Sequence, residues 1–180
     1  MGYGGGDGLL SVDSNLSVIA MGRTRMAIGH HYQNAYVTRN VDKAVDRFRE
    51  LAEPRLIIEM EVEVSLSTPE GDGKGVQKLA FVWVEDLNYE FIQPKSGDVL
   101  RIFRDALPED DGLAFHHVCH RVDDWDVAMD RIQKNPFPIV LSGGTPGLMK
   151  FCYVDTRPWL GHFTEYIWAA PERWQQLGGR

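Results

Sequence analysis

The chain has 180 residues, of which 43% are hydrophobic and 25% are charged, and these values are typical of a globular protein with one core or of two small modules that share a core. A formal net charge of −7 argues against a general nucleic-acid partner and against attraction to an anionic membrane surface. No apolar run approaches the roughly 18 residues that a membrane-spanning helix needs.

The first half of the chain is predicted to hold a strand, a helix and three further strands. Residues 1–31 are rich in glycine and are interpreted as an N-terminal extension. Asn40 is a suitable helix N-cap, Pro54 stops the helix, and the polar run 68–75 is expected to be a hairpin loop. Periodicity places the five elements at residues 32–38, 41–52, 57–67, 77–85 and 87–93, so that residues 32–94 form a βαβββ module.

The second half repeats this order after a connector over residues 95–113, in which 96–107 is expected to be a helix. Asp124 is the expected N-cap of the second long helix. The elements fall at residues 114–122, 125–134, 139–142, 148–155 and 162–168, which gives a second βαβββ module over 114–169 and a helical tail over 170–180. The predicted fold class is therefore α+β, with two βαβββ modules side by side forming an open, cup-shaped mixed sheet.

An internal repeat supports the interpretation of two equivalent halves. The segments that begin at Gln33 and at His117 match at a fixed offset of 84, through two aspartates, an alanine, an arginine and several apolar positions. A Glu-aromatic-Ile triplet follows in each half, beginning at Glu90 and at Glu165. Each half therefore offers one possible metal ligand at the head of its repeat and one glutamate later.

Strand periodicity places these side chains on one face. Residues two apart in a strand share a face, so Gln33 and His117 lie on the concave side if the opposite faces cover the following helices. Glu90 and Glu165 lie between apolar neighbours, where a carboxylate is costly unless it is paired or bound to a metal. One amide oxygen, one imidazole and two carboxylates suit a single divalent ion, and the candidates Zn, Ni, Co, Mn and Fe remain open.

Four motifs follow one another along residues 32–169: the strand end at 90–94, the triplets at 116–118 and 122–124, and the segment 155–165. Together they resemble the vicinal oxygen chelate superfamily, which includes glyoxalase I, methylmalonyl-CoA epimerase, extradiol dioxygenases and bleomycin-resistance proteins. They are most similar to the glyoxalase-like branch that contains the epimerases. Asn40 replaces the family's usual aspartate, and residues 155–161 replace its usual turn before the last glutamate, which argues against glyoxalase I itself.

The resemblance implies a divalent-metal-dependent isomerase, epimerase or lyase that removes a proton next to a metal-bound carbonyl of a small molecule. It implies metal ligands at Gln33, Glu90, His117 and Glu165, of which the two glutamates are candidates for the catalytic base. Arg121, on the same face as His117, and Trp159, in a loop, are candidate substrate-binding residues. The oligomeric state is left open, and a homodimer is one candidate because sheet edges in this family often pair.

Two alternatives remain open. An Fe(II) ring-cleaving dioxygenase needs two histidines, and His31 is an imperfect substitute for the amide at Gln33. A metal-free binding protein of the bleomycin-resistance type needs an apolar cup, but it leaves the paired glutamates unexplained. The histidines outside the proposed ligand set are assigned structural or supporting roles: His30, His31, His116 and His120.

The cysteines bear on the cellular compartment. Cys119 and Cys152 are the two cysteines of the chain, and their spacing does not form a disulfide framework. A reducing cytoplasm is therefore the expected location.

Overall fold

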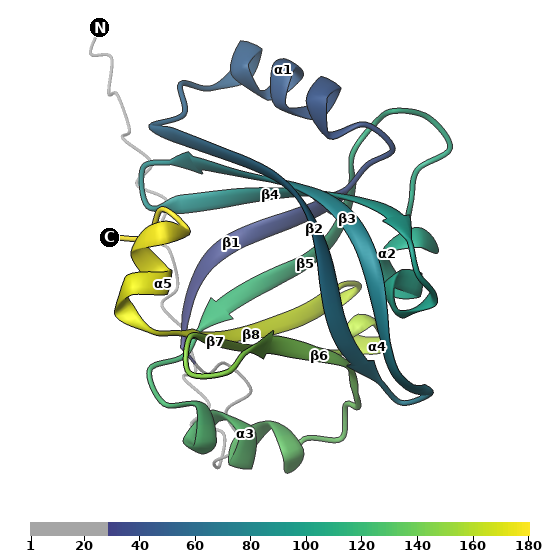
Figure 1. Cartoon of the computed structure of the whole chain (residues 1–180), viewed down its shortest axis with the longest axis vertical. Coiled ribbons are helices and arrows are strands. Elements are labelled where there is room, and N and C mark those ends of the chain that lie inside the picture. Colours follow the sequence, from purple (N-terminus) through teal and green to yellow (C-terminus); the bar gives the residue numbers. More distant parts are fainter. Residues whose placement is uncertain (1–28) are drawn as a thin grey trace, which may run out of the picture.

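The computed structural model describes residues 29–180, so residues 1–28 of the expected N-terminal extension lie outside the described part of the chain (Figure 1). The first half contains β1 (His30–Val37), α1 (Val41–Leu51), β2 (Leu56–Thr68), β3 (Gly71–Val84) and β4 (Leu87–Ser96). The second half contains β5 (Ala114–Arg121), α3 (Trp125–Gln133), β6 (Ile139–Thr145), β7 (Met149–Val154) and β8 (Phe163–Ala169). Short helices complete the fold: η1 (Asp98–Leu100), α2 (Arg101–Arg104), α4 (Arg157–Leu160) and α5 (Pro171–Gln176).

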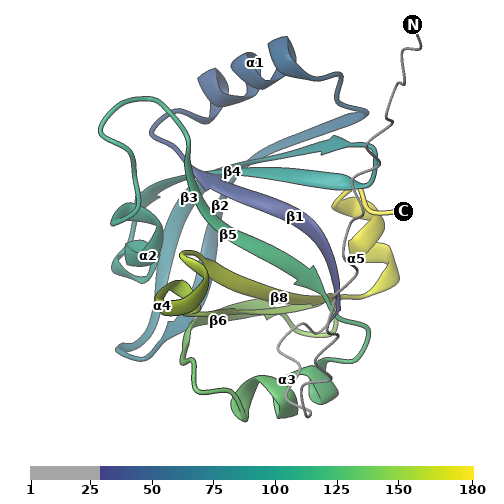
Figure 2. The same cartoon turned by 180° about the vertical axis from the view of Figure 1, so that it is seen from behind.

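The strands form one closed barrel in the order β1-β4-β3-β2-β6-β7-β8-β5. Each half contributes four neighbouring strands, and the halves meet where β1 pairs with β5 in antiparallel fashion. Helices α1 and α3 lie on opposite outer sides of the barrel, whereas α5 lies at one end and α2 and α4 at the other (Figures 1 and 2). The α+β class and the paired βαβββ order are those predicted from the sequence.

The two outer helices form where the sequence predicts them. The side chain of Asn40 accepts a hydrogen bond from the backbone N–H of Lys43 at 3.1 Å, and that of Asp124 accepts one from Val127 at 3.0 Å. Each helix buries one apolar stripe against the outside of the sheet. For α1 the stripe packs on β3 and β4 through Val41, Ala44, Val45, Ala80, Val82 and Phe91. For α3 the stripe packs on β7, β8 and the residue after β5, and the buried cluster consists of Val122, Ala128, Ile132, Cys152, Val154 and Tyr166.

The interior of the barrel is apolar at both ends. Near α2, a cluster of buried side chains includes Leu100, Phe103, Leu141, Tyr153 and Phe163. At the opposite end, Trp174 of α5 packs against Trp83 and closes the barrel. Burial of this apolar surface provides the main driving force for folding, and it leaves a chamber between the two clusters.

Three expectations were wrong in detail, and the first two concern connections between elements. Strands β2 and β3 continue almost to their turn, between Thr68 and Gly71, where a long hairpin loop was expected; Gly71 reverses the chain with a φ of 131°. The expected helix over 96–107 is reduced to η1 and α2, because β4 extends to Ser96 and Gly97 turns the chain with a φ of 98°.

The third difference is that the sheet is closed, where an open cup was expected. The extended β2 reaches β6, but only Leu66 and Ser67 pair with it, opposite Gly143 and Ser142. Along the rest of its length β2 pairs with β3 alone among the described strands, so β2 and β6 are not hydrogen-bonded over most of this side of the barrel. Within residues 29–180, no helix has the length and apolar character required to span a membrane.

Candidate metal centre

The candidate site lies where the two halves meet. In the antiparallel pairing of β1 with β5, Gln33 faces Cys119 and Ala35 faces His117. Parallel neighbours add the carboxylates, since Glu90 of β4 is the partner of Ala35 and Glu165 of β8 is the partner of Cys119. Each glutamate is thus in register with the residue two positions after Gln33 or His117, and the two halves place their side chains in the same way.

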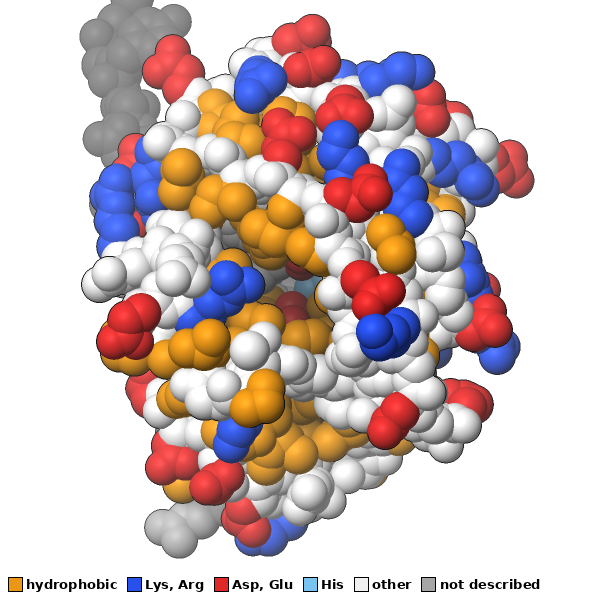
Figure 3. All heavy atoms as spheres, in the orientation of Figure 1, with side chains coloured by type: hydrophobic (Ala, Val, Ile, Leu, Met, Phe, Trp, Pro, Cys, Tyr) orange, Lys and Arg blue, Asp and Glu red, His pale blue; other side chains and the backbone are white. Residues whose placement is uncertain are grey.

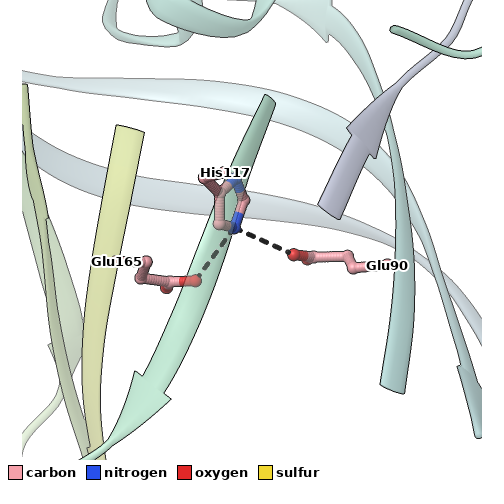
Figure 4. Close-up of side chains that lie close together, drawn as sticks. All are labelled: Glu90, His117 and Glu165. Carbon is pink, nitrogen blue, oxygen red and sulfur yellow. Dashed lines mark hydrogen bonds and ion pairs between the residues drawn. The ribbon is translucent and has the colours of Figure 1, made fainter. Parts of the chain in front are cut away.

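The four residues proposed as ligands come together. His117 Nε2 lies 3.1 Å from Glu165 Oε2 and 3.6 Å from Glu90 Oε2 (Figure 4). Gln33 Nε2 donates a hydrogen bond to Glu90 Oε2 at 2.5 Å. Possible ligand atoms of Glu90, His117 and Glu165 all lie within 4.8 Å of one another. Among the described residues, these three form the group of histidine, cysteine or acidic side chains that is close enough to hold a metal ion.

The site is deeply buried, because none of these four residues is more than 6% exposed. Burial and the neighbouring Glu165 carboxylate raise the pKa of Glu90 well above its ordinary value, against the opposing effect of the hydrogen bond from Gln33. Two carboxylates and an imidazole are stable in such a place when they share a cation. The donor set therefore fits one divalent metal ion, held by oxygen and nitrogen ligands.

A cavity of about 410 Å³ leads to this cluster, and Gln33, Glu90 and Glu165 lie on its wall. Figure 3 shows the opening, with acidic side-chain atoms at its floor. Most of the remaining lining is apolar and comes from β2, β3, β6 and β7, including Met60, Val62, Val64, Leu79, Phe81 and Phe151. The arrangement provides a polar floor inside an apolar chamber, as in many small-molecule sites.

The two residues proposed to bind substrate lie elsewhere. The guanidinium of Arg121 stacks on the ring of Trp174 at 4.3 Å, and Arg121 does not line the cavity. Trp159 is 66% exposed on α4 and stacks on Phe137 with a centroid distance of 6.3 Å, also away from the cavity lining. Both placements depend on contacts between distant segments, which strand parity and local sequence do not reveal.

The remaining histidines separate into two groups. His31 Nε2 lies 3.0 Å from the side-chain oxygen of Asn34, and its ring is 5.5 Å from that of His120. His30 is exposed at the start of β1. His116, in contrast, is buried and its Nδ1 lies 2.9 Å from Nδ1 of His117.

Several residues at the site were not predicted to have a functional position. Tyr153 lines the cavity, its ring meets that of His117 edge-on at 4.9 Å, and burial with the nearby Glu165 raises its pKa well above the ordinary value. Tyr153 is paired with Glu165 in the β7–β8 register, so alternation along β7 could have indicated that it lies at the site. Arg173 lines the cavity because α5 folds over the barrel end, and no local pattern indicates that placement.

The fold and the buried cluster of Glu90, His117 and Glu165 define a class of two-module βαβββ proteins with a candidate site at the module junction. The model of the Glyoxalase/Bleomycin resistance protein/Dioxygenase superfamily matches residues 32–153, and the chain belongs to this family. This agrees with the resemblance to the vicinal oxygen chelate superfamily. A comparison with curated protein sequences gave no match.

Solved structures with the same fold include methylmalonyl-CoA epimerase from Mycobacterium tuberculosis, with 14% identity, a TM-score of 0.54, and coverage of 82% of this chain and 95% of that one. A Streptomyces coelicolor methylmalonyl-CoA epimerase variant in complex with 2-nitronate-propionyl-CoA has 13% identity, a TM-score of 0.54, and coverage of 81% and 97%. A hypothetical protein from Bacillus halodurans C-125 has 11% identity, a TM-score of 0.52, and coverage of 78% and 94%. At these identities the likeness establishes the fold.

Proposed function

We propose that the protein is a metal-dependent enzyme of the vicinal oxygen chelate type, which removes a proton next to a carbonyl group of a small molecule. The observation that carries the proposal is the convergence of Glu90, His117 and Glu165 within 4.8 Å at the floor of the cavity. Isomerisation, epimerisation or elimination follows from such a proton transfer, depending on where the proton or leaving group goes.

The chain's own residues would divide the work between binding and proton transfer. Gln33, Glu90, His117 and Glu165 would hold the divalent ion. When bound, the ion would supply Lewis-acid stabilisation of negative charge that develops on a carbonyl oxygen. The apolar walls exclude water and so strengthen the electrostatic interactions at the floor.

Glu90 and Glu165 are the two candidates for the base, since both line the cavity and can meet a substrate C–H bond. The raised pKa of Glu90 brings this carboxyl nearer to the range in which a general base is effective at neutral pH. Glu165 lies beside His117 and in register with Cys119 and Tyr153. General-base catalysis of this kind contributes about 10²–10⁴-fold to a rate.

The walls favour a substrate with an apolar body and a polar carbonyl end. Arg173 of α5 brings a positive charge to the lining, where an anionic substituent would be favoured. Methylmalonyl-CoA, named as the ligand of a similar structure, is a first compound to test. A reducing, cytoplasmic location is part of the proposal and is supported by the burial of the free thiols of Cys119 and Cys152.

The first test is the metal content of the purified protein. We expect about one divalent ion per chain, lost in Glu165→Ala and Glu90→Gln. Glu63→Gln is a matched control, because Glu63 also lines the cavity but pairs with Lys74 at 2.7 Å and stands outside the cluster. Metal that persists in both cluster variants would contradict the proposed site.

The second test is solvent isotope exchange. Carbonyl compounds with apolar bodies, and methylmalonyl-CoA, are incubated in ²H₂O with the metal-loaded protein, and mass spectrometry follows deuterium at the carbon next to the carbonyl. Exchange should require the metal and at least one of Glu90 and Glu165. Oxygen uptake with catechols and iron, without exchange, would favour the dioxygenase alternative. The dioxygenase alternative requires a second imidazole in the cluster. His31 is hydrogen-bonded to Asn34 instead, and this position counts against that alternative.

A further inference from the structure

His116 and His117 are neighbours in β5, yet both side chains are buried inside the barrel. An irregularity in the β1–β5 pairing explains this: Ala35 faces His117 and Tyr36 faces Phe115, so His116 is an extra residue in its strand. A bulge of this kind re-aims a side chain that would otherwise point to the opposite face. The bulge therefore places a second imidazole directly behind the proposed metal ligand.

A chain of contacts runs from a backbone carbonyl to the metal cluster. His116 Nε2 lies 3.1 Å from the carbonyl oxygen of Ile102, and His116 Nδ1 lies 2.9 Å from His117 Nδ1. On its far side, His117 Nε2 faces Glu165 Oε2 at 3.1 Å and Glu90 Oε2 at 3.6 Å. Every nitrogen of the two rings thus has a defined neighbour.

The position of each proton follows from the first contact. A carbonyl oxygen only accepts hydrogen bonds, so His116 Nε2 must carry a proton. In a neutral imidazole the other nitrogen is then an acceptor, and His117 Nδ1 must donate to it. His117 Nε2 is then the nitrogen that faces Glu90 and Glu165, and it is the atom of this ring that can bind a cation held between the two carboxylates.

We propose that His116 is a positioning residue that holds His117 in the tautomer with its proton on Nδ1, so that the Nε2 lone pair is available to a divalent cation between Glu90 and Glu165. The proposal concerns the same site as the proposed function and rests on it for the role of the cation. The proton on Nδ1 follows from hydrogen bonds within the protein. A cation between Glu90 and Glu165 would take the place of any proton between His117 Nε2 and Glu165, whose atoms lie 3.1 Å apart.

The opposite tautomer is disfavoured by the same contacts. If His117 Nε2 carried the proton and donated it to Glu165, His117 Nδ1 would need a donor from His116. His116 Nε2 would then present a lone pair to the Ile102 carbonyl at 3.1 Å, and the two acceptors would repel each other. The Ile102 carbonyl, on the short helix α2, therefore decides the tautomer of both rings.

The ring of His116 is also fixed in place. It is stacked between Phe103, at a centroid distance of 4.8 Å, and Phe163, at 4.9 Å, with interplanar angles of 29° and 27°. Because its Nε2 proton is directed at the Ile102 carbonyl, Nδ1 is the nitrogen that remains to accept from His117. The two phenylalanine rings therefore keep this acceptor aligned with His117.

Nuclear magnetic resonance of metal-free protein labelled with ¹⁵N-histidine tests the proposal, because long-range ¹H–¹⁵N correlations report which ring nitrogen carries the proton. We expect His117 to be protonated at Nδ1 and His116 at Nε2. In His116→Phe, which removes the acceptor, His117 should move to the Nε2-protonated form and donate to Glu165. In His116→Asn, the side-chain oxygen can accept from Nδ1 and the original tautomer should persist.

Calorimetric Zn²⁺ binding provides a second readout. Loss of a residue that orients a metal ligand lowers affinity by about 10–100-fold, so His116→Phe should show a decrease of this size and His116→Asn should recover most of it. His120→Phe is the matched control, since His120 is on the same strand but contacts His31 and Tyr166 away from the cluster. It should leave both the His117 tautomer and Zn²⁺ affinity unchanged.

The wild-type spectrum alone can overturn the proposal, whether or not His116→Phe folds. A metal-free wild-type protein in which His117 carries no proton on Nδ1 would contradict it, as would a His117 that keeps its Nδ1 proton in folded His116→Phe. If the His117 tautomer changes as expected in His116→Phe but the wild type binds no divalent ion, the positioning role of His116 is supported and the proposed function fails.

Discussion

The two halves of the molecule supply the same positions with different chemistry. In the second half, an imidazole faces Glu165, while in the first half the amide of Gln33 donates a hydrogen bond to Glu90. The partnerships are equivalent in register, since each glutamate pairs with the residue two after Gln33 or His117. The fold thus fixes the positions of the proposed ligands, and the side chain at each position determines how strongly that position can bind a metal ion.

The halves also differ in the residue that precedes each proposed ligand at the head of the repeat, Gln33 or His117. Tyr32 occupies the position that the repeat makes equivalent to His116, and it too is the extra residue at an irregularity in the β1–β5 pairing. Its ring packs on Trp83 and Trp174 and its hydroxyl lies 3.7 Å from Cys119 Sγ, so it does not orient Gln33. Among the described residues, a hydrogen-bonded side chain stands behind the proposed ligand His117 but not behind Gln33, and we expect the second half to dominate metal binding.

The largest effects should come from removing ligands of the second half. His117→Ala and Glu165→Ala should each lower Zn²⁺ affinity by at least about 100-fold, more than the loss of an orienting neighbour costs. Gln33→Ala should lower it only about 10-fold, because an amide oxygen is a neutral and weak ligand. Calorimetry on the three variants checks the order, and equal losses would show that the halves contribute equally.

Replacing the weaker ligand should strengthen the site. In Gln33→His, a second imidazole enters the cluster, and affinity for Zn²⁺ or Fe²⁺ should rise relative to wild type by about 10-fold, since imidazole suits both ions. Competition with a chelating dye measures the change. A loss of affinity would mean that the hydrogen bond from Gln33 to Glu90, which this variant removes, is worth more than an added ligand.

The buried imidazole of His116 should make the protein sensitive to acid. Its folded-state pKa is about 3 and its ordinary value is 6.5, so the unfolded chain binds a proton that the folded chain excludes between these values. The associated stability is complete above pH 6.5 and decreases as pH falls towards 3. At pH 5 the cost is about 2 kcal/mol, from roughly 1.4 kcal/mol per pH unit.

Urea unfolding between pH 7.5 and 5 measures this effect. The free energy of unfolding of His116→Asn should fall less steeply with acidification than that of the wild type, by about 2 kcal/mol at pH 5. Parallel curves for the two proteins would indicate that His116 is not held in its neutral form by burial.

The smallest effect is expected on the outer surface. Trp159→Ala should change the free energy of unfolding by less than about 0.5 kcal/mol and leave Zn²⁺ affinity unchanged, because the ring is largely exposed and meets only Phe137 among aromatic side chains of the described residues. Thermal unfolding and calorimetry provide the check. A large loss of substrate binding in this variant would restore Trp159 to the role that the sequence suggested.

These comparisons show which features local sequence determines. The caps at Asn40 and Asp124 and the inward face of Gln33 and His117 follow from hydrogen-bonding groups and strand alternation, which act over a few residues. The repeat extended this local information to the glutamates, so the convergence of these four side chains was predictable, while their role as ligands stays a prediction. The stacking of Arg121 on Trp174 depends on α5 folding over the barrel end, and that contact spans more than fifty residues of sequence.

Bulges escaped prediction for a related reason. Strict alternation assigns His116 to the face opposite His117, and only the pairing with β1 reveals the extra residue that turns it inwards. The closure of β2 on β6 likewise depends on pairing between segments far apart in the sequence, Leu66 and Ser67 with Gly143 and Ser142. Long-range register thus decides the features that sequence periodicity does not contain.

The account depends most on one metal position shared by both halves. Anomalous diffraction from crystals of the full chain soaked in a Zn²⁺ salt tests it directly. We expect one strong peak among the side chains of Gln33, Glu90, His117 and Glu165. Peaks confined to surface residues such as His30, with none at the floor of the cavity, would contradict the central claim.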